Sequence, residues 1–230
     1  IGRPLTIEMV KHRVEDLYHG ASKKLKTIYI KDIQQKFKLG AFTLSFFQID
    51  HTIMDAVGVI LETPVATVIH PGDWTLEKSS TGGKVLTYTH LAKLKRPTIL
   101  MLEALGSTNS KKPVTQEEML SNLYRLMSDA PGRTIIATFS SQIERIKQIL
   151  EFAAKTNRKV ALDGFSMKLN VELATKLGYI KIPKGVIITT DKAHTYPDNK
   201  VVIICTGAQG EEMAALSRII AGNHRFIKLK

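Results

Sequence analysis

The sequence is poor in the residues that mark secreted, membrane-spanning or disordered proteins. Its one cysteine, Cys205, cannot form an intrachain disulfide, and within an apolar run it is expected to pack rather than react. The longest apolar runs, such as Val201 to Cys205, fall far short of the roughly 18 to 20 residues of a membrane span, and no charged-then-apolar leader opens the chain. With 43% apolar and 23% charged residues, the composition is globular. We therefore expect a cytoplasmic protein with a buried core and no membrane partner.

Acidic residues are the other shortage. The chain of 230 residues has 21 Asp and Glu against 33 Lys and Arg, a formal net charge of +12. The usual physical use of such an excess is attraction to a polyanion, such as nucleic acid or an anionic membrane surface. The alternative is that the lysines only keep the protein soluble. The basic segment Lys23 to Lys38 is interleaved with apolar residues, so its charges would then lie on the solvated side of a strand pair.

The first half of the chain has a short helix followed by strands. Apolar residues at helical spacing predict a helix over Leu5 to Leu17, with Thr6 as its cap. Short runs rich in Ile, Val, Phe and Thr, separated by Gly, Pro and Asp, predict a β-rich layer. The predicted strands are Thr27 to Ile30, Lys36 to Leu39, Phe42 to Phe47, Gly58 to Glu62 and Ala66 to His70.

The second half alternates strands with helices. The predicted helices are Thr115 to Met127, Ser141 to Lys155, Asn170 to Leu177 and Gln209 to Ile220. The predicted strands are Arg133 to Phe139, Lys159 to Leu162, Gly185 to Thr190, Val201 to Cys205 and Arg225 to Leu229. Steady alternation predicts an α/β fold with a mainly parallel sheet flanked by helices. We place the boundary between the halves in the polar stretch Asn109 to Pro113.

Three loops after the predicted strands are candidates for binding anions. In a parallel sheet the loops at the carboxyl ends of strands meet helix N-termini, whose unpaired N–H groups attract phosphates. Small hydroxyl-bearing or glycine residues stand there, and ordinary helix capping would explain any one of these loops alone. Three in one sheet favour a phosphate-binding surface. The candidate residues are Ser140, Ser141, Ser166, Met167, Thr206, Gly207, Gln209 and Gly210.

Several segments, in the same order along the chain, resemble motifs of the ribonuclease J family. They cover almost the whole sequence. Residues 206–218, with Gly222 and His224 after them, are similar to a family signature. The other matching segments are Ser107-Thr108-Asn109, residues 138–146, Asp163-Gly164-Phe165-Ser166-Met167, Leu177-Gly178-Tyr179, His51-Thr52-Ile53-Met54-Asp55 and residues 68–74.

This resemblance implies part of a metallo-β-lactamase αββα sandwich in residues 1–112 and a partial β-CASP domain in residues 113–230. It implies a ribonuclease that uses two divalent metal ions, which would be zinc. Such an enzyme acts as a 5′-to-3′ exonuclease and endonuclease in RNA processing. By the same resemblance His51 is a metal ligand, Asp73 is a catalytic carboxylate that bridges the metals, and Ser107, Thr108 and Asn109 contact RNA. The partners implied are RNA and a second copy or a paralogous subunit.

The sequence also departs from the family. It lacks the motif His-x-His-x-Asp-His, so we expect an internal piece of a longer protein that by itself binds no stoichiometric metal and is inactive. Gly106 replaces an acidic residue, Phe165 an arginine and Met54 a proline. Two hypotheses therefore remain: a metal-dependent ribonuclease, and a non-catalytic RNA-binding or assembly paralogue.

Overall fold

The computed structural model describes the chain except residues 52, 75–85, 95–96, 106, 109–113 and 230. Its contacts divide the chain into two units, which are described separately. Unit 1 comprises Ile1–His51 and Asp55–Met119, and unit 2 comprises Thr52–Met54 and Leu120–Lys230. The predicted boundary at residues 109–113 lies outside the described residues, so the assignment of residues 1–112 and 113–230 to two domains stays a prediction.

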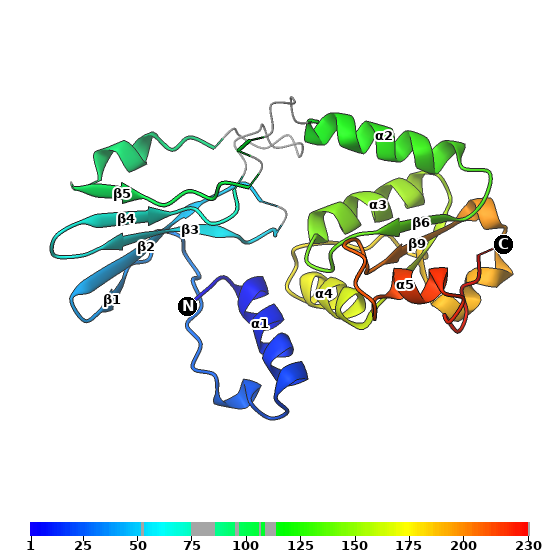
Figure 1. The fold of residues 1–230 in the computed structure, drawn as a ribbon, viewed down its shortest axis with the longest axis horizontal. Helices are drawn as coiled ribbons and strands as arrows, with labels where there is room; N and C mark the ends of the chain where they lie inside the picture. Colours follow the sequence, from blue (N-terminus) through cyan, green and yellow to red (C-terminus); the bar gives the residue numbers. More distant parts are fainter. Residues whose placement is uncertain (52, 75–85, 95–96, 106, 109–113, 230) are drawn as a thin grey trace. The chain divides into compact units, whose positions relative to one another are not determined.

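Unit 1 is a mixed five-stranded sheet accompanied by helix α1 (Pro4–Leu17) (Figure 1). Its strands follow one another in the order of the sequence, antiparallel up to β4, and β5 then pairs with β4 in parallel. Alternating apolar residues bury one face around Phe47, Ile60 and Ile69. The strands are β1 (Phe37–Leu39), β2 (Phe42–Gln48), β3 (Val57–Glu62), β4 (Thr67–His70) and β5 (Thr98–Leu100).

The N-terminus of α1 is capped from a distant part of unit 1. The predicted cap, Thr6, lies inside the helix, and Arg3 at the N-cap position makes no capping side-chain bond. Asp55 caps the helix instead: its buried carboxylate accepts hydrogen bonds from the backbone N–H groups of Leu5 (2.7 Å) and Thr6 (3.2 Å) and from the Thr6 hydroxyl (2.7 Å). A negative charge there also favours the positive end of the helix dipole.

Unit 2 is a parallel four-stranded sheet in the order β6-β9-β7-β8 with helices on both faces (Figure 1). The strands are β6 (Thr134–Ala137), β7 (Lys159–Asp163), β8 (Ile187–Ile188) and β9 (Val201–Cys205). The helices are α2 (Gln116–Asp129), which begins in unit 1, α3 (Ile143–Lys155), α4 (Phe165–Lys176) and α5 (Ala215–Ile220). Short 3₁₀ helices cover Ser22–Lys24, Thr89–Lys93, Thr190–Thr195 and Asp198–Lys200.

The centre of unit 2 is β9, which is buried on both faces along its whole length. Val201, Ile203 and Cys205 pack against Ala215 and Ile219 of α5, among other residues. Such a strand reads as an unbroken apolar run because helices cover both sides of the sheet. The predicted α/β class is confirmed.

Two predicted strands are wrong, for local reasons. Thr27 to Ile30 makes only an isolated bridge between Tyr29 and Gly2. The pairing cannot extend because α1 begins two residues after Gly2, at Pro4. Arg225 to Leu229 forms no strand, since the N–H groups of Phe226 and Ile227 bond to the imidazole of His224 instead.

Other predicted elements have different bounds. The helix predicted from Gln209 begins only at Ala215, because Gly210 takes a positive φ angle of 77° that interrupts an α-helix. The strand predicted from Gly185 to Thr190 shrinks to the two residues of β8, and α4 begins at Phe165 rather than Asn170. Strand β5 has no counterpart among the predicted elements. None of the helices in the described parts of the chain is long and apolar enough to cross a bilayer.

Candidate functional site

Three parallel strands of unit 2 end at the same level. In the register of the sheet, Cys205 at the end of β9 lies between Ala137 at the end of β6 and Asp163 at the end of β7. The loops that follow them therefore meet at one edge, which we call the strand-end edge (residues 138–141, 163–168 and 206–211). The expectation that these three loops share one edge is confirmed.

Two glycines allow the backbones at this edge to approach closely. Gly164 has a φ angle of 105°, and a Cβ atom there would lie 2.8 Å from Oγ1 of Thr206. Gly207 has a φ angle of 116°, and a Cβ atom there would lie 2.8 Å from Cβ of Leu216. Any other residue would meet both backbone strain and a clash. Gly164 thus brings loop 163–168 into contact with loop 206–211, and Gly207 brings loop 206–211 against the start of α5.

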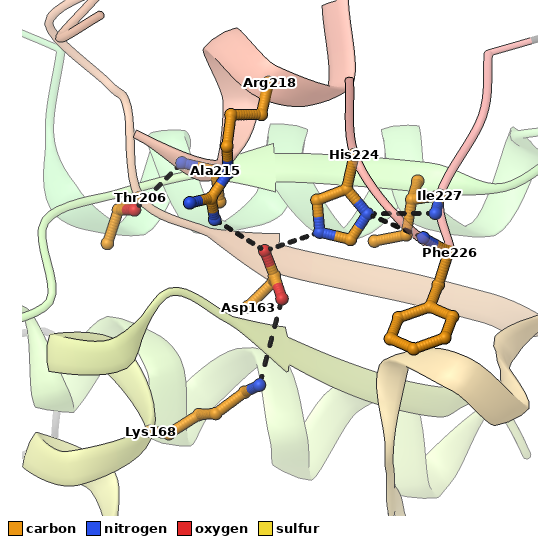
Figure 2. A network of polar contacts seen from close by, with 8 residues as sticks. All are labelled: Asp163, Lys168, Thr206, Ala215, Arg218, His224, Phe226 and Ile227. Atoms are coloured by element: carbon orange, nitrogen blue, oxygen red, sulfur yellow. Dashed lines mark hydrogen bonds and ion pairs between the residues drawn. The ribbon is translucent and has the colours of Figure 1, made fainter. Parts of the chain in front are cut away.

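A buried carboxylate lies at the centre of the edge (Figure 2). Asp163 is 5% exposed, and its Oδ2 lies 3.0 Å from Nε2 of His224. Two cationic groups face the same carboxylate: Nζ of Lys168 lies 3.8 Å from Oδ1, and a guanidinium nitrogen of Arg218 lies 3.8 Å from Oδ2. One buried negative charge therefore connects β7, α4, α5 and the C-terminal segment.

The hydrogen bonds of His224 define its tautomer. Its Nδ1 accepts the backbone N–H groups of Phe226 (3.2 Å) and Ile227 (3.0 Å). The ring proton is therefore on Nε2, which donates to Asp163. His224 thus fixes the C-terminal segment against the end of β7.

The two cations at the edge are available to a ligand. Their side chains are about half exposed, 54% for Lys168 and 45% for Arg218, whereas the Asp163 side chain is 8% exposed. The buried carboxylate thus positions both cations, and about half of each cationic side chain remains exposed to solvent. Burial, together with the charge of Asp163, raises the pKa of the neighbouring Cys205 thiol to about 11, and this thiol stays protonated at neutral pH.

The predicted contact residues of unit 2 differ in exposure. Ser166, Gln209 and Gly210 are exposed, and Ser140 and Ser141 are partly buried. The Thr206 hydroxyl accepts the N–H of Ala215 at 3.3 Å, so it also orders the start of α5.

Two predicted contact residues do not present side chains to a ligand. Met167 is fully buried and belongs to the core, so a side-chain contact with RNA is excluded for it. Gly207 is also buried, and its role is the close approach of its backbone to the start of α5. Both belong to the support of the edge rather than to its outer surface.

The residues predicted to hold metal lie in unit 1. His51 is partly buried and Asp73 is exposed. Imidazole and carboxylate are suitable donors for a divalent ion, but two ligands do not complete the four that zinc takes. In the described part of the chain no three His, Cys, Asp or Glu side chains are grouped to hold a metal. These residues alone do not fit a metal pair, so their metal role stays a prediction.

A third predicted group lies apart in the sequence from the edge. Ser107 and Thr108 are exposed residues of unit 1, and Asn109 lies outside the described residues. Asp163, Lys168 and Arg218 are absent from the predicted site residues. For Asp163 a signal was present, because an acidic residue directly after a buried strand stands where site residues of α/β folds gather.

Comparisons with known proteins agree with this geometry. Residues 131–230 match the family model described as ribonuclease J, beta-CASP domain. The chain is 33% identical over 232 residues to ribonuclease J of Helicobacter pylori J99, covering 100% of this chain and 33% of that protein. It is 34% identical over 235 residues to ribonuclease J of Thermus thermophilus, covering 100% and 40%. For ribonuclease J of Corynebacterium glutamicum the identity is 36% over 193 residues, covering 83% and 27%.

A solved structure shares the fold. A protein of unknown function from Enterococcus faecalis V583 superposes with a TM-score of 0.60 at 13% identity, covering 89% of this chain and 52% of that chain. The family model identifies residues 131–230, which make up most of unit 2, as similar to the β-CASP domain of ribonuclease J. The chain as a whole is homologous to ribonuclease J, and the resemblance to that family is confirmed. It spans between 27% and 40% of the length of the three relatives named above.

Proposed function

We propose that this chain is part of a ribonuclease J-like RNA phosphodiester hydrolase and that its strand-end edge binds the RNA backbone. The observation that carries the proposal is the pair of half-exposed cations, Lys168 and Arg218, that the buried Asp163 holds among three loops. The relatives named ribonuclease J support RNA as the ligand class.

The electrostatics of unit 2 favour a polyanion. Residues 120–230 contain 17 Lys and Arg against nine Asp and Glu, so this segment carries most of the chain's excess positive charge. Phosphate contacts by lysine and arginine release condensed counterions, and affinity therefore falls steeply as salt rises. Exposed hydroxyl and amide groups of Ser166 and Gln209 add neutral hydrogen-bond donors beside the cations.

A non-catalytic RNA-binding paralogue is the second candidate. It is favoured by the exposed Phe165, which stands at the position of an arginine in the family's Gly-Arg-Ser-Met turn. In the proposed hydrolase, His51 and Asp73 would be two of the ligands of divalent metal, which would supply Lewis-acid chemistry to phosphodiester hydrolysis. Metal dependence, exonuclease or endonuclease action, a cytoplasmic location and assembly with a second subunit stay predictions.

The test compares three variants that each add one carboxylate. Ser166→Glu and Gln209→Glu place it on the strand-end edge, where phosphate would bind. Asn199→Glu places it at the opposite end of the sheet, because Asn199 precedes the first residue of β9. Glutamate in the first turn of α4 favours the helix dipole, so Ser166→Glu is expected to fold.

Fluorescence anisotropy of a short labelled single-stranded RNA at two salt concentrations measures the outcome. We expect Ser166→Glu and Gln209→Glu to weaken binding clearly more than Asn199→Glu at fixed salt. Equal losses for all three variants would mean diffuse attraction by the lysines, and absence of binding at low salt would remove RNA as a ligand of this chain. Release of shortened RNA by the full-length protein with added divalent metal distinguishes the hydrolase from the paralogue.

A further inference from the structure

The exposed aromatic residues of unit 2 are concentrated at one edge. Residues 120–230 contain seven Phe and Tyr side chains. Four of them, Tyr124, Phe152, Tyr179 and Tyr196, are partly buried, whereas Phe139, Phe165 and Phe226 are 39%, 71% and 43% exposed. Single exposed apolar residues are common on any surface, but two at one edge and a third connected to that edge need a physical reason.

Phe139 and Phe165 belong to the strand-end edge, and Phe226 is connected to it through His224. Phe139 and Phe165 each follow by two residues the ends of β6 and β7, which lie on either side of β9. With neighbouring strands about 4.8 Å apart, the ends of β6 and β7 are roughly 10 Å apart. The backbone of Phe226 is tied to this edge, because its N–H donates to His224 and His224 donates to Asp163 (Figure 2).

Cations alternate with these rings. Lys168 follows Phe165 by three residues on α4, so the two side chains lie on the same side of its first turns. Arg218 faces Asp163, and the guanidinium of Arg225 lies 4.9 Å from the centre of the Phe226 ring. The acidic groups of this edge are the buried Asp163 and the exposed Glu211 and Glu212. Aromatic rings interleaved with cations are the arrangement that proteins use for single-stranded nucleic acid, where rings stack on bases and cations bind phosphates.

We propose that Phe165, with Phe139 and Phe226 beside it, forms a stacking platform for unpaired bases of single-stranded RNA. This inference rests on the proposed binding of the RNA backbone at the strand-end edge and adds the bases as a second element of recognition. Every base has an apolar face, so the platform accepts RNA of any sequence but requires it to be single-stranded.

Phe165 departs from the turn that its segment resembles. The Gly-Arg-Ser-Met turn of the ribonuclease J family has arginine at this position, and a guanidinium interacts with phosphate through its charge. A phenyl ring carries no charge and has an apolar face. At this position a phenyl ring would therefore contribute contact with a base rather than salt-dependent contact with a phosphate.

The experiment compares two RNA probes of equal length and charge. One is an oligoadenylate, and the other is an oligoribonucleotide backbone without bases. Stacking on a single ring contributes enough that its loss weakens binding about fivefold or more. We expect Phe165→Ala to weaken binding of oligoadenylate by that factor and to leave binding of the base-free probe unchanged. Phe165→Trp is expected to restore or exceed the original affinity for oligoadenylate.

Two controls separate stacking from folding and from charge. Tyr18→Ala removes an aromatic ring of equal exposure, 70%, from unit 1, and it should change neither affinity. Lys168→Ala should weaken both probes and reduce the dependence of affinity on salt, whereas Phe165→Ala should leave that dependence unchanged. If Phe165→Ala weakens the binding of both probes equally, or weakens the binding of neither, the stacking platform is refuted while the proposed binding of the RNA backbone stands. If the unaltered chain binds neither probe at low salt, both proposals fail.

Discussion

Replacing Asp163 with alanine removes the carboxylate on which the strand-end edge depends. The buried Nε2–H of His224 then loses its acceptor, because its other ring nitrogen already accepts two backbone N–H groups. A hydrogen bond to a charged group contributes about 1.5–3 kcal/mol, and an unpaired buried donor costs a similar amount. Lys168 and Arg218 add little, since pairs with half-exposed cations contribute about 0–1 kcal/mol each. We therefore expect Asp163→Ala to lower the local free energy of unfolding by about 2–3 kcal/mol.

A double-mutant cycle isolates the pair. Asp163→Ala, His224→Ala and the double variant should give a coupling free energy of about 1.5–3 kcal/mol, because the packing losses of each single change cancel in the cycle. Asp163→Asn is the matched control: its amide oxygen can still accept from Nε2–H, so it should cost less than alanine.

Amide hydrogen exchange is the suitable assay, because the chain has two units and global unfolding need not be two-state. The amides of β9 report the stability of unit 2 as a whole, and the N–H groups of Phe226 and Ile227 report the local contact. We expect the N–H groups of Phe226 and Ile227 to exchange faster in Asp163→Ala. A coupling free energy below about 0.5 kcal/mol would refute the reasoning, because pairs that do not interact are additive within that range.

Three further predictions concern stability and reactivity. Asp55→Ala should destabilise α1 by about 2 kcal/mol, the upper range for loss of a helix cap, with faster amide exchange at Leu5 and Thr6; unchanged exchange would contradict the capping role. Hydrogen bonds from Ser22 and Gly20 lower the pKa of Glu15 to about 2 from its usual 4.5. Its stabilisation should therefore be complete above pH 4.5 and lost as the pH falls toward 2, and a Glu15→Gln chain should lack this part of the pH dependence of unfolding. Cys205, fully buried and with a raised pKa, should react with a thiol reagent at pH 8 only when denaturant is added; rapid reaction of the folded chain would contradict its burial.

The local pattern of the sequence predicts the elements that depend on local physics. The run Val201 to Cys205 matches the bounds of β9, because a central parallel strand is apolar on both faces. The common edge of three loops also follows from alternation of strand and helix. A predicted helix bound is wrong where a glycine at positive φ interrupts the helix, as at Gly210 before α5.

Contacts between distant residues could not be predicted in this way. Asp163 and His224 are 61 positions apart, and Asp55 caps a helix that begins about 50 positions earlier. No spacing rule connects such pairs, since only the folded chain brings them together. The pairing of β5 with β4 could not be predicted either, because the three exposed residues of β5 show no alternation that would indicate a strand.

The most direct test of the central claim is to map the residues of the chain that contact RNA. A single-stranded RNA with photoreactive uridines is crosslinked to the unaltered chain, and the modified peptides are identified by mass spectrometry. The account predicts crosslinks to residues 138–141, 163–168 and 206–211, with Phe165 among the modified residues. Crosslinks that fall instead on the basic segment Lys23 to Lys38, with none at the strand-end edge, would contradict it.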